Sequence, residues 1–495
     1  MSQTLSLIIE GFANLFVWPT LGWLLLGVVL GIILGAIPGI GPVVGMALIL
    51  PFTAGMEGID VIIMFVMMYL GGMYGSSIAA ILINAPGTAA AAATTMDGYP
   101  MSQNGKSINA LTISAISSSL GGLLTAGALL VIGPLMLTLV LLLGSPEYFL
   151  VAFIGIAMIT IVAKGALVKG IIVGCFGLSI TTIGLGGHIL SPRYTFGQPA
   201  LNDGIDFVAV LIGLFALAEM IRLSDKVGGI SDGETGLSGS RKEGLKSVLD
   251  NPLDVIKSGY LGMIVGSVPG AGASVSNFVA YSEGKRTDKN PESFGTGNPR
   301  GVVTAEAANT GTTAGSIVPT FAFGIPGSAT TAVLLGALIM HGLQPGPNLF
   351  TSNIDVTYTV FTSLILGNIV IALIGVLFVT KMGYLTEIDT HIIIPLVVAL
   401  AILGSFAIRN LWIDVIVVLL FGLMGYYMKM YNYSLIALVL GVVLGPIAEQ
   451  NLFRSLQLSG GSLSIFVSSP VSLLLTIMLI LLLISPVIKS MYTRN

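Results

Sequence analysis

Long apolar stretches separated by short polar turns recur along almost the whole chain. The stretch from Thr112 to Leu143 contains no charged residue, and it exceeds the roughly 20 apolar residues that an α-helix needs to cross a bilayer. Backbone groups in lipid must be hydrogen-bonded within the protein, and runs this continuous suit helices rather than the alternating strands of a barrel. The pattern therefore predicts an all-α integral membrane protein, a multi-span helical bundle.

The apolar runs also predict where the helices lie. In the first half of the chain they occupy 21–37, 43–50, 61–93, 108–143, 148–163, 170–190 and 207–221. In the second half they occupy 259–280, 302–340, 358–380, 392–407, 411–428, 434–447 and 471–488. Ahead of them, residues from Leu7 to Val17 form a shorter apolar stretch that suits an interfacial or re-entrant helix.

Composition and charge exclude several classes of protein. Hydrophobic residues make up 54% of the chain and charged residues 9%, against roughly 25% charged residues in soluble domains. The net charge of −3 is too small to imply a nucleic-acid partner, and no basic cluster is dense enough to change that view. The one cysteine, Cys175, excludes an internal disulfide framework and a cysteine-rich metal site. We expect no cofactor.

Two motifs occur twice along the chain, in the same order. Residues 35–41, Gly-Ala-Ile-Pro-Gly-Ile-Gly, return as residues 266–272, Gly-Ser-Val-Pro-Gly-Ala-Gly. The Gly-Ser pair at 75–76 precedes the Pro-Gly pair at 86–87, and the pairs at 315–316 and 326–327 repeat this spacing. The order predicts two structural repeats, a first membrane repeat at 1–221 and a second at 258–495.

The stretch between the repeats, 222–257, holds six of the 20 lysines and arginines. Short loops rich in these residues stay in the cytoplasm, so we expect a cytoplasmic polar linker. Equivalent loops of the two repeats differ in charge: 50–60 has no Lys or Arg, whereas its counterpart 281–301 has four. The turn that ends at Lys106 is basic, whereas its counterpart, 341–348, is not. If basic loops are cytoplasmic, the repeats are inverted relative to each other.

Pro-Gly interruptions at corresponding positions of two repeats indicate the site of a secondary transporter, because substrates and ions bind where discontinuous helices meet. Proline removes a backbone donor, so the N–H groups of the restarting helix can face an anion. Nearby hydroxyls could bind carboxylate oxygens or sodium. The predicted substrate and ion site comprises Pro38, Gly39, Gly41, Ser76, Ser77, Asn84, Pro86, Gly87, Thr88, Pro269, Gly270, Gly272, Ser274, Asn277, Pro326, Gly327, Ser328 and Thr330, with Ser316 as a further hydroxyl.

Several of these residues, and two further acids, also have a structural explanation. Pro and Gly are common in membrane helices, where they make kinks and close contacts. Asn84 and Asn277 could cap broken backbone. Asp97 suits a loop turn, and Glu219 could snorkel from the end of an apolar run.

Glu306 and Asn309 form a second group, shortly before the second Pro-Gly pair. An ionisable residue at membrane depth is costly, so Glu306 is a candidate for binding a coupling proton or cation, and Asn309 for orienting substrate or sodium. Alternatively, Glu306 follows Arg300 closely and could complement the dipole at an interfacial helix start.

These motifs resemble those of a known family. The runs 69–78, 84–88 and 97–101, with 306–309, 324–328 and 341–347, closely resemble the large membrane subunit of tripartite tricarboxylate transporters, the TctA family. The resemblance covers nearly the whole chain. Ala89 stands where a proline often follows Pro-Gly-Thr, and Thr310 where a second asparagine is usual.

The resemblance implies a multi-pass protein of the bacterial inner membrane. Its expected partners are a small four-helix membrane subunit (TctB-like), a periplasmic substrate-binding protein (TctC-like), membrane lipid and a small organic carboxylate, with a homodimer of the complex also open. It further implies symport driven by Na⁺ or H⁺, and analogy suggests an elevator-type movement. A passive anion channel is the alternative function. An intramembrane enzyme is disfavoured, because no nucleophile, base or metal constellation appears in the sequence.

Overall fold

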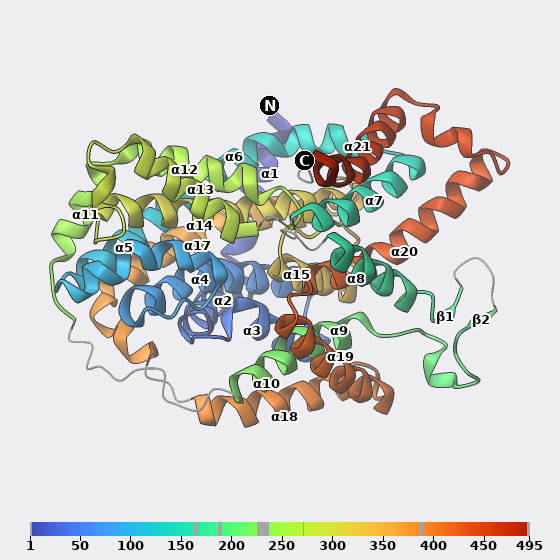
Figure 1. The fold of residues 1–495 in the computed structure, drawn as a ribbon, viewed down its shortest axis with the longest axis horizontal. Coiled ribbons are helices and arrows are strands. Elements are labelled where there is room, and N and C mark those ends of the chain that lie inside the picture. The colour runs from blue at the N-terminus through green and yellow to red at the C-terminus, as the bar shows by residue number, and fades with distance from the viewer. Residues whose placement is uncertain are drawn as a thin grey trace.

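The computed structural model describes residues 2–162, 167–186, 191–224, 237–270, 272–386 and 390–492, which are mainly helical (Figure 1). The α-helices are α1 Ser2–Leu15, α2 Thr20–Ala36, α3 Gly41–Ile49, α4 Gly58–Ile83, α5 Ala92–Gln103, α6 Ser107–Leu141, α7 Ser145–Val162, α8 Leu167–Ile180, α9 Phe207–Leu211, α10 Ala218–Ser224, α11 Arg241–Leu249, α12 Pro252–Gly266, α13 Gly272–Thr287, α14 Pro299–Phe323, α15 Ala329–Met340, α16 Pro347–Phe350, α17 Ile354–Leu377, α18 Thr390–Arg409, α19 Trp412–Met430, α20 Leu435–Leu458 and α21 Pro470–Tyr492.

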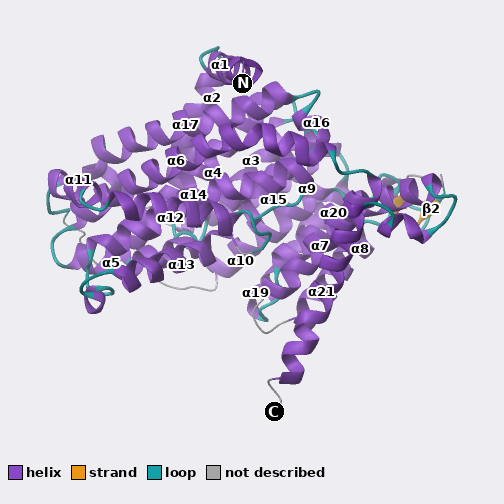
Figure 2. Cartoon of the chain, turned by 90° about the horizontal axis from the view of Figure 1, so that it is seen from above, coloured by secondary structure: helices purple, strands orange, loops and turns teal. Residues whose placement is uncertain are grey.

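Shorter elements join these helices. The 3₁₀ turns are η1 Leu50–Thr53, η2 Ala89–Ala91, η3 Pro199–Leu201, η5 Pro291–Ser293, η6 Val379–Thr386 and η7 Leu463–Val467, while η4 Ile212–Leu217 is a π-helical stretch that joins α9 to α10. Two short strands, β1 Gly184–Leu185 and β2 Pro192–Arg193, pair antiparallel. They lie at one extremity of the molecule, away from the central helices (Figure 2).

Six helical segments of the described chain are long and apolar enough to cross a membrane. They are α4, α6, the continuous segment Phe207–Ser224, α17, α19 and α20. The pair α1 and α2, bent by 77°, adds a seventh if it counts as one span. The all-α, multi-pass membrane protein predicted from the apolar runs is therefore confirmed. The division into repeats at 222–257 stays a prediction, and residues 225–236 of that linker lie outside the described residues.

Equivalent helices of the two motif copies pack in the same way. In the first copy α2 packs against α4, and in the second copy α12 packs against α14. A Cβ atom on Gly75 of α4 would lie 2.3 Å from the Ile32 carbonyl oxygen, and one on Gly315 of α14 would lie 2.1 Å from the Met263 carbonyl oxygen. Only glycine allows two helix backbones to approach this closely. The repeated glycines therefore set the same helix spacing twice.

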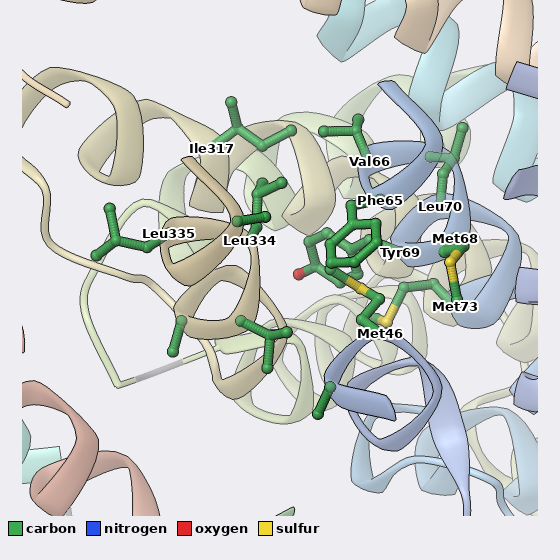
Figure 3. Packing of buried hydrophobic residues seen from close by; sticks show 14 of the residues in the cluster. Met46, Phe65, Val66, Met68, Tyr69, Leu70, Met73, Ile317, Leu334 and Leu335 are labelled. Carbon is green, nitrogen blue, oxygen red and sulfur yellow. The ribbon is translucent and has the colours of Figure 1, made fainter. Parts of the chain in front are cut away.

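The two central helices, α4 and α14, run antiparallel to each other. Residue 69 of α4 lies beside residue 316 of α14, while residue 77 lies beside residue 306. Figure 3 shows the apolar side of this arrangement, where Ile317 of α14 and Leu334 of α15 lie across from Phe65 of α4. Because α4 and α14 carry the equivalent motifs, equivalent segments of the chain point in opposite directions.

The peripheral helices exchange partners between the halves. From the second half, α20 packs against α7 and α8 of the first half. From the first half, the segment α9–η4–α10 packs against α18 and α19 of the second half. Each half therefore covers apolar surface of the other, away from the central helices α4 and α14.

Candidate functional site

Both central helices end in the same backbone motif just before their Pro-Gly pairs. After α4, Asn84 has a left-handed backbone, with φ 56°, and the Ala85 N–H bonds to the Ala79 carbonyl. After α14, Gly324 has φ 67°, and the Ile325 N–H bonds to the Pro319 carbonyl. A left-handed residue followed by this wider hydrogen bond is a common way to terminate a helix. The two breaks thus begin alike.

Each Pro-Gly pair then returns against its own repeat. A Cβ atom on Gly87 would lie 2.1 Å from the Gly35 carbonyl oxygen and 3.2 Å from the Cα atom of Ser76. In the second copy, a Cβ atom on Gly327 would lie 2.9 Å from the Gly266 carbonyl oxygen and 2.9 Å from the Cβ atom of Ser316. The four motif segments recognised in the sequence therefore meet in two equivalent pairs.

The glycines of the other motif make this meeting sterically feasible. Gly39 and Gly41 have φ values of 89° and 63°, and Gly270 and Gly272 have φ values of 80° and 57°. Positive φ angles cost a residue with a Cβ atom about 1 kcal/mol or more. The turns at Pro38 and Pro269 consequently require glycine in both copies.

The helical segments that begin after the two breaks differ in how their N-termini are capped. Ser328 caps α15, because its hydroxyl accepts a hydrogen bond from the Thr331 N–H and its own N–H donates to the Thr331 hydroxyl. At the equivalent position Thr88 makes no such cap, and its hydroxyl donates to the Ser76 hydroxyl over 3.0 Å. The N-terminus after the first break is therefore not capped by its own side chain.

Side chains from each half link to the break of the other, Tyr69 directly and Asn309 through Met73 and Ser76. Tyr69 of α4 places its hydroxyl 3.1 Å from that of Ser316 and 3.5 Å from that of Ser328. Asn309 of α14 donates from Nδ2 to the Met73 carbonyl oxygen over 3.1 Å, and that oxygen also accepts from the Ser76 hydroxyl. The two breaks are thus joined crosswise through buried polar groups.

Asn277 provides a further link between the halves. It lies on α13 and donates from Nδ2 to the Ala90 carbonyl oxygen of η2, over 3.0 Å. Asn277 therefore binds backbone that follows the first break, in the other half of the chain. Asn84 differs, because its side chain is exposed. Thr330 is buried, and the side chain of Ser274 lies outside the described residues.

Glu306 lies in a nest of hydroxyl groups from the first half. Its Oε1 accepts hydrogen bonds from Ser77 at 2.6 Å and from Thr94. Its Oε2 accepts from Ser114 at 3.1 Å and from Ser118 at 2.7 Å. The side chain is fully buried and lies two turns inside α14, so the interpretation as an interfacial helix-start acid is wrong.

Asp97 is a residue whose role the sequence did not reveal. It lies inside α5 and is fully buried, so its assignment to a loop turn is wrong. One carboxylate oxygen accepts the backbone N–H groups of Gly295, Gly297 and Asn298, and the other accepts the Tyr281 hydroxyl. Asp97 thereby fixes the basic loop of the second half. The Asp-Gly sequence indicates a turn, and nothing local indicates partners so distant.

Glu219 is a second such residue. Its buried carboxylate pairs with Arg222 of the same helix and with Lys429 of α19. One of its oxygens would lie 3.4 Å from a Cβ atom on Gly39. Glu219 is therefore an ion-paired group beside the first Pro-Gly turn, and snorkelling does not describe it. The spacing Glu-x-x-Arg could have indicated half of this cluster, but not Lys429.

Two further observations limit the site. Among the described residues, no group of three or more His, Cys, Asp or Glu side chains could hold a metal ion. A cavity of about 540 Å³ lies beside the two strands, lined among others by Arg193, Asn202 and Glu449, and no predicted site residue lines it. Predicted residues of the described chain, such as Thr88 and Ser328, lie instead at the breaks that follow α4 and α14.

The chain is similar to known proteins over most of its length. Residues 21–440 match the family described as the tripartite tricarboxylate transporter TctA family. An uncharacterized 52.8 kDa protein in the TAR-I ttuC' 3' region of Agrobacterium vitis is 31% identical over 478 residues, covering 95% of this chain and 94% of that protein. An uncharacterized protein in the TAR-II ttuC' 3' region of the same organism is 32% identical over 232 residues, covering 46% of this chain and 96% of that protein. No solved structure matches. The chain belongs to the tripartite tricarboxylate transporter TctA family.

Proposed function

We propose that this chain is the large membrane subunit of a binding-protein-dependent secondary transporter, which imports organic carboxylates by ion-coupled symport. The observation that carries the proposal is the pair of equivalent helix breaks on antiparallel helices, joined crosswise by Tyr69 and Asn309. Secondary transporters with inverted repeats bind substrate and ion where such broken helices meet near the middle of the membrane.

The first break suits the carboxylate group of the substrate. The helix that restarts after Thr88 has no side-chain cap, and the hydroxyls of Thr88 and Ser76 lie beside it. Free N–H groups at a helix N-terminus favour an anion, and hydroxyls can add hydrogen bonds to carboxylate oxygens. At the second break, Ser328 and Thr331 already bond to each other's backbone. We therefore assign the substrate carboxylate to the first break.

Loop contacts support inverted repeats in the membrane. The basic loop 281–301 lies against Asp97, close to the turn that ends at Lys106. The non-basic loops also meet each other, because the hydroxyl of Thr53 lies 3.0 Å from Nε2 of His341. We place the basic group in the cytoplasm, since Lys and Arg accumulate on that side of the bacterial inner membrane. The other group then faces the periplasm.

Family membership supports the expected partners. Transporters of this family are tripartite, so we propose that the chain works with a small TctB-like membrane subunit and a periplasmic TctC-like binding protein. An elevator-type movement of the layer that carries α4 and α14, past the exchanged peripheral helices, would give the site alternating access. The coupling ion in this proposal is Na⁺ or H⁺, and the complex could pair as a homodimer.

The test is uptake of labelled di- and tricarboxylates into proteoliposomes that contain this chain and its small partner. We expect uphill uptake that requires both the binding protein and an ion gradient. Thr88→Val should reduce it at least about tenfold, the effect of about 1.4 kcal/mol. Thr95→Val should not, because the Thr95 hydroxyl donates to the Ala91 carbonyl one turn earlier. Downhill flux that ignores both the binding protein and the gradient would instead favour a passive anion channel.

A further inference from the structure

Three buried oxygen atoms on α14 have no hydrogen-bond partner among the described residues. They are Oδ1 of Asn309, Oγ1 of Thr310 and Oγ1 of Thr313. All three side chains are at least 98% buried. A buried polar atom without a partner costs about 1–3 kcal/mol, and native structures contain few of them. Three on one short segment therefore point to a ligand that the oxygens would bind.

The three oxygens share a helix face with Glu306. Relative to Glu306, the residues Asn309, Thr310 and Thr313 stand at positions i+3, i+4 and i+7 of α14. Residues at these spacings lie above one another on the same side of an α-helix. The Tyr69 hydroxyl of α4 lies one turn further along α14, beside Ser316. Neutral oxygens and one carboxylate thus line a single buried strip.

Among the described residues, no basic side chain pairs with the Glu306 carboxylate. In the part of the chain that the structure describes, Glu306 forms no ion pair, and its only polar partners are the four hydroxyls of Ser77, Thr94, Ser114 and Ser118. Four donors fill the acceptor positions of a carboxylate and so offset part of the cost that burial places on its ionised form. A buried negative charge beside unpartnered oxygens attracts a small hard cation.

We propose that Asn309, Thr310 and Thr313 form a binding site for one sodium ion, with the charge of Glu306 as its counter-charge. One acid matches a monovalent rather than a divalent ion. Amide and hydroxyl oxygens are hard ligands, which suit sodium. Sodium binding is inferred from these four residues alone. The role of sodium as the coupling ion rests on the proposed transport function.

The same asparagine connects the cation site to the first break. While Oδ1 of Asn309 binds the ion, Nδ2 donates to the Met73 carbonyl, which also accepts the Ser76 hydroxyl. Ser76 in turn accepts the Thr88 hydroxyl at the break. Fixing the amide of Asn309 would therefore stabilise the arrangement to which the substrate carboxylate binds. The cation and the anion would each favour binding of the other, which is the requirement for symport.

The test uses the purified full chain, without any substrate. Thermal unfolding is followed while NaCl replaces KCl at constant ionic strength, and ²²Na binding is measured on the same folded sample. We expect sodium, and not potassium, to raise the Tm in a saturable way, as a ligand of the native state must. Thr310→Val and Thr313→Val should each raise the half-saturating sodium concentration about tenfold. Glu306→Gln should abolish the effect.

Thr304→Val is the matched control, because its buried hydroxyl on α14 already donates to the Arg300 carbonyl. It should leave the sodium dependence unchanged. Equal Tm values in sodium and potassium for the wild type, or an unchanged half-saturating concentration in both valine variants, would overturn the site. Sodium binding without carboxylate uptake would leave the site standing and refute the proposed transport function alone.

Discussion

The hydroxyl of Tyr69, on a helix of the first half, lies 3.1 Å from the hydroxyl of Ser316, on the antiparallel helix of the second half. The two residues are 247 positions apart in sequence. Both are buried, and the Ser328 hydroxyl that starts α15 lies 3.5 Å from the same tyrosine oxygen. The tyrosine therefore holds both edges of the second break.

Tyr69→Phe is expected to weaken the second break while keeping the apolar packing. Removing one buried hydrogen-bonding group costs about 1 kcal/mol, because its hydroxyl partners lose a neighbour. We expect a lower Tm and reduced uptake, measured at equal amounts of membrane protein. Tyr384→Phe is the control, since Tyr384 is mostly exposed. Unchanged uptake in Tyr69→Phe would show that this contact does not support transport.

Glu306→Ala should destabilise the protein more than Glu306→Gln. Alanine leaves four buried hydroxyls without their common acceptor, at a cost of order 3 kcal/mol. Glutamine keeps the shape and one acceptor oxygen, so we expect it to fold. Comparing the Tm of both variants with their carboxylate uptake separates a structural role of Glu306 from a role in transport. Loss of uptake in a folded Glu306→Gln would assign the charge to transport, whereas normal uptake would assign Glu306 to structure alone.

At Asn84, the backbone rather than the side chain is expected to matter. Its φ of 56° disfavours residues with a Cβ atom, and glycine occupies the equivalent position 324. Asn84→Gly should therefore keep or raise the Tm, while Asn84→Ala should cost about 1 kcal/mol. If Asn84→Gly transports normally, the exposed amide is not a ligand. If it loses uptake at unchanged Tm, the side chain binds substrate after all.

Asp97→Asn should loosen the basic loop of the second half. Three backbone N–H groups and one tyrosine hydroxyl bond to its carboxylate, and bonds to a charged acceptor contribute about 1.5–3 kcal/mol each. The amide nitrogen of asparagine cannot accept them. We expect faster tryptic cleavage at the exposed Lys289 than in wild type or in the exposed control Asp250→Asn. Equal cleavage rates would contradict the anchoring role.

The inverted topology predicts opposite labelling of two loops. In a Cys175→Ser background, single cysteines at Glu57 and Lys289 should react with impermeant reagents from opposite sides of the membrane. Both positions are exposed, whereas Thr53 in the same first loop is buried and hydrogen-bonded, and so is a poor reporter. Labelling of both cysteines from the same side would refute inverted repeats.

The helical class and the positions of the helix ends could be predicted from local chemistry. Continuous apolar runs specify membrane helices, and glycine and proline act on their own backbone, so the ends near Ile83 and Phe323 follow from the residues next to them. The crosswise contacts could not be predicted. Tyr69 finds its partner 247 positions away, and Asp97 finds Tyr281 184 positions away. Such pairs depend on how the repeats fold against each other.

Local spacing gave a wrong prediction for two acidic residues, Glu306 and Asp97, that are fully buried in the structure. Glu306 lies six residues after Arg300, which suggested an interfacial acid, yet helix α14 begins at Pro299 and carries it directly into the interior. Asp-Gly at 97–98 indicates a turn in isolation, but both residues lie inside α5, where Gly98 packs closely against Ile81 of α4. Tertiary contacts overrode the propensity of these residues.

The exchange of peripheral helices between the halves has a consequence for biogenesis. During synthesis α7 and α8 leave the ribosome long before α20, and α9–η4–α10 emerges before α18 and α19. These first-half helices therefore enter the membrane before the second-half helices against which they finally pack. A nascent chain cut between the halves would display unpaired surfaces to membrane quality control, and each fragment would be rescued only by supplying the other in the same cell.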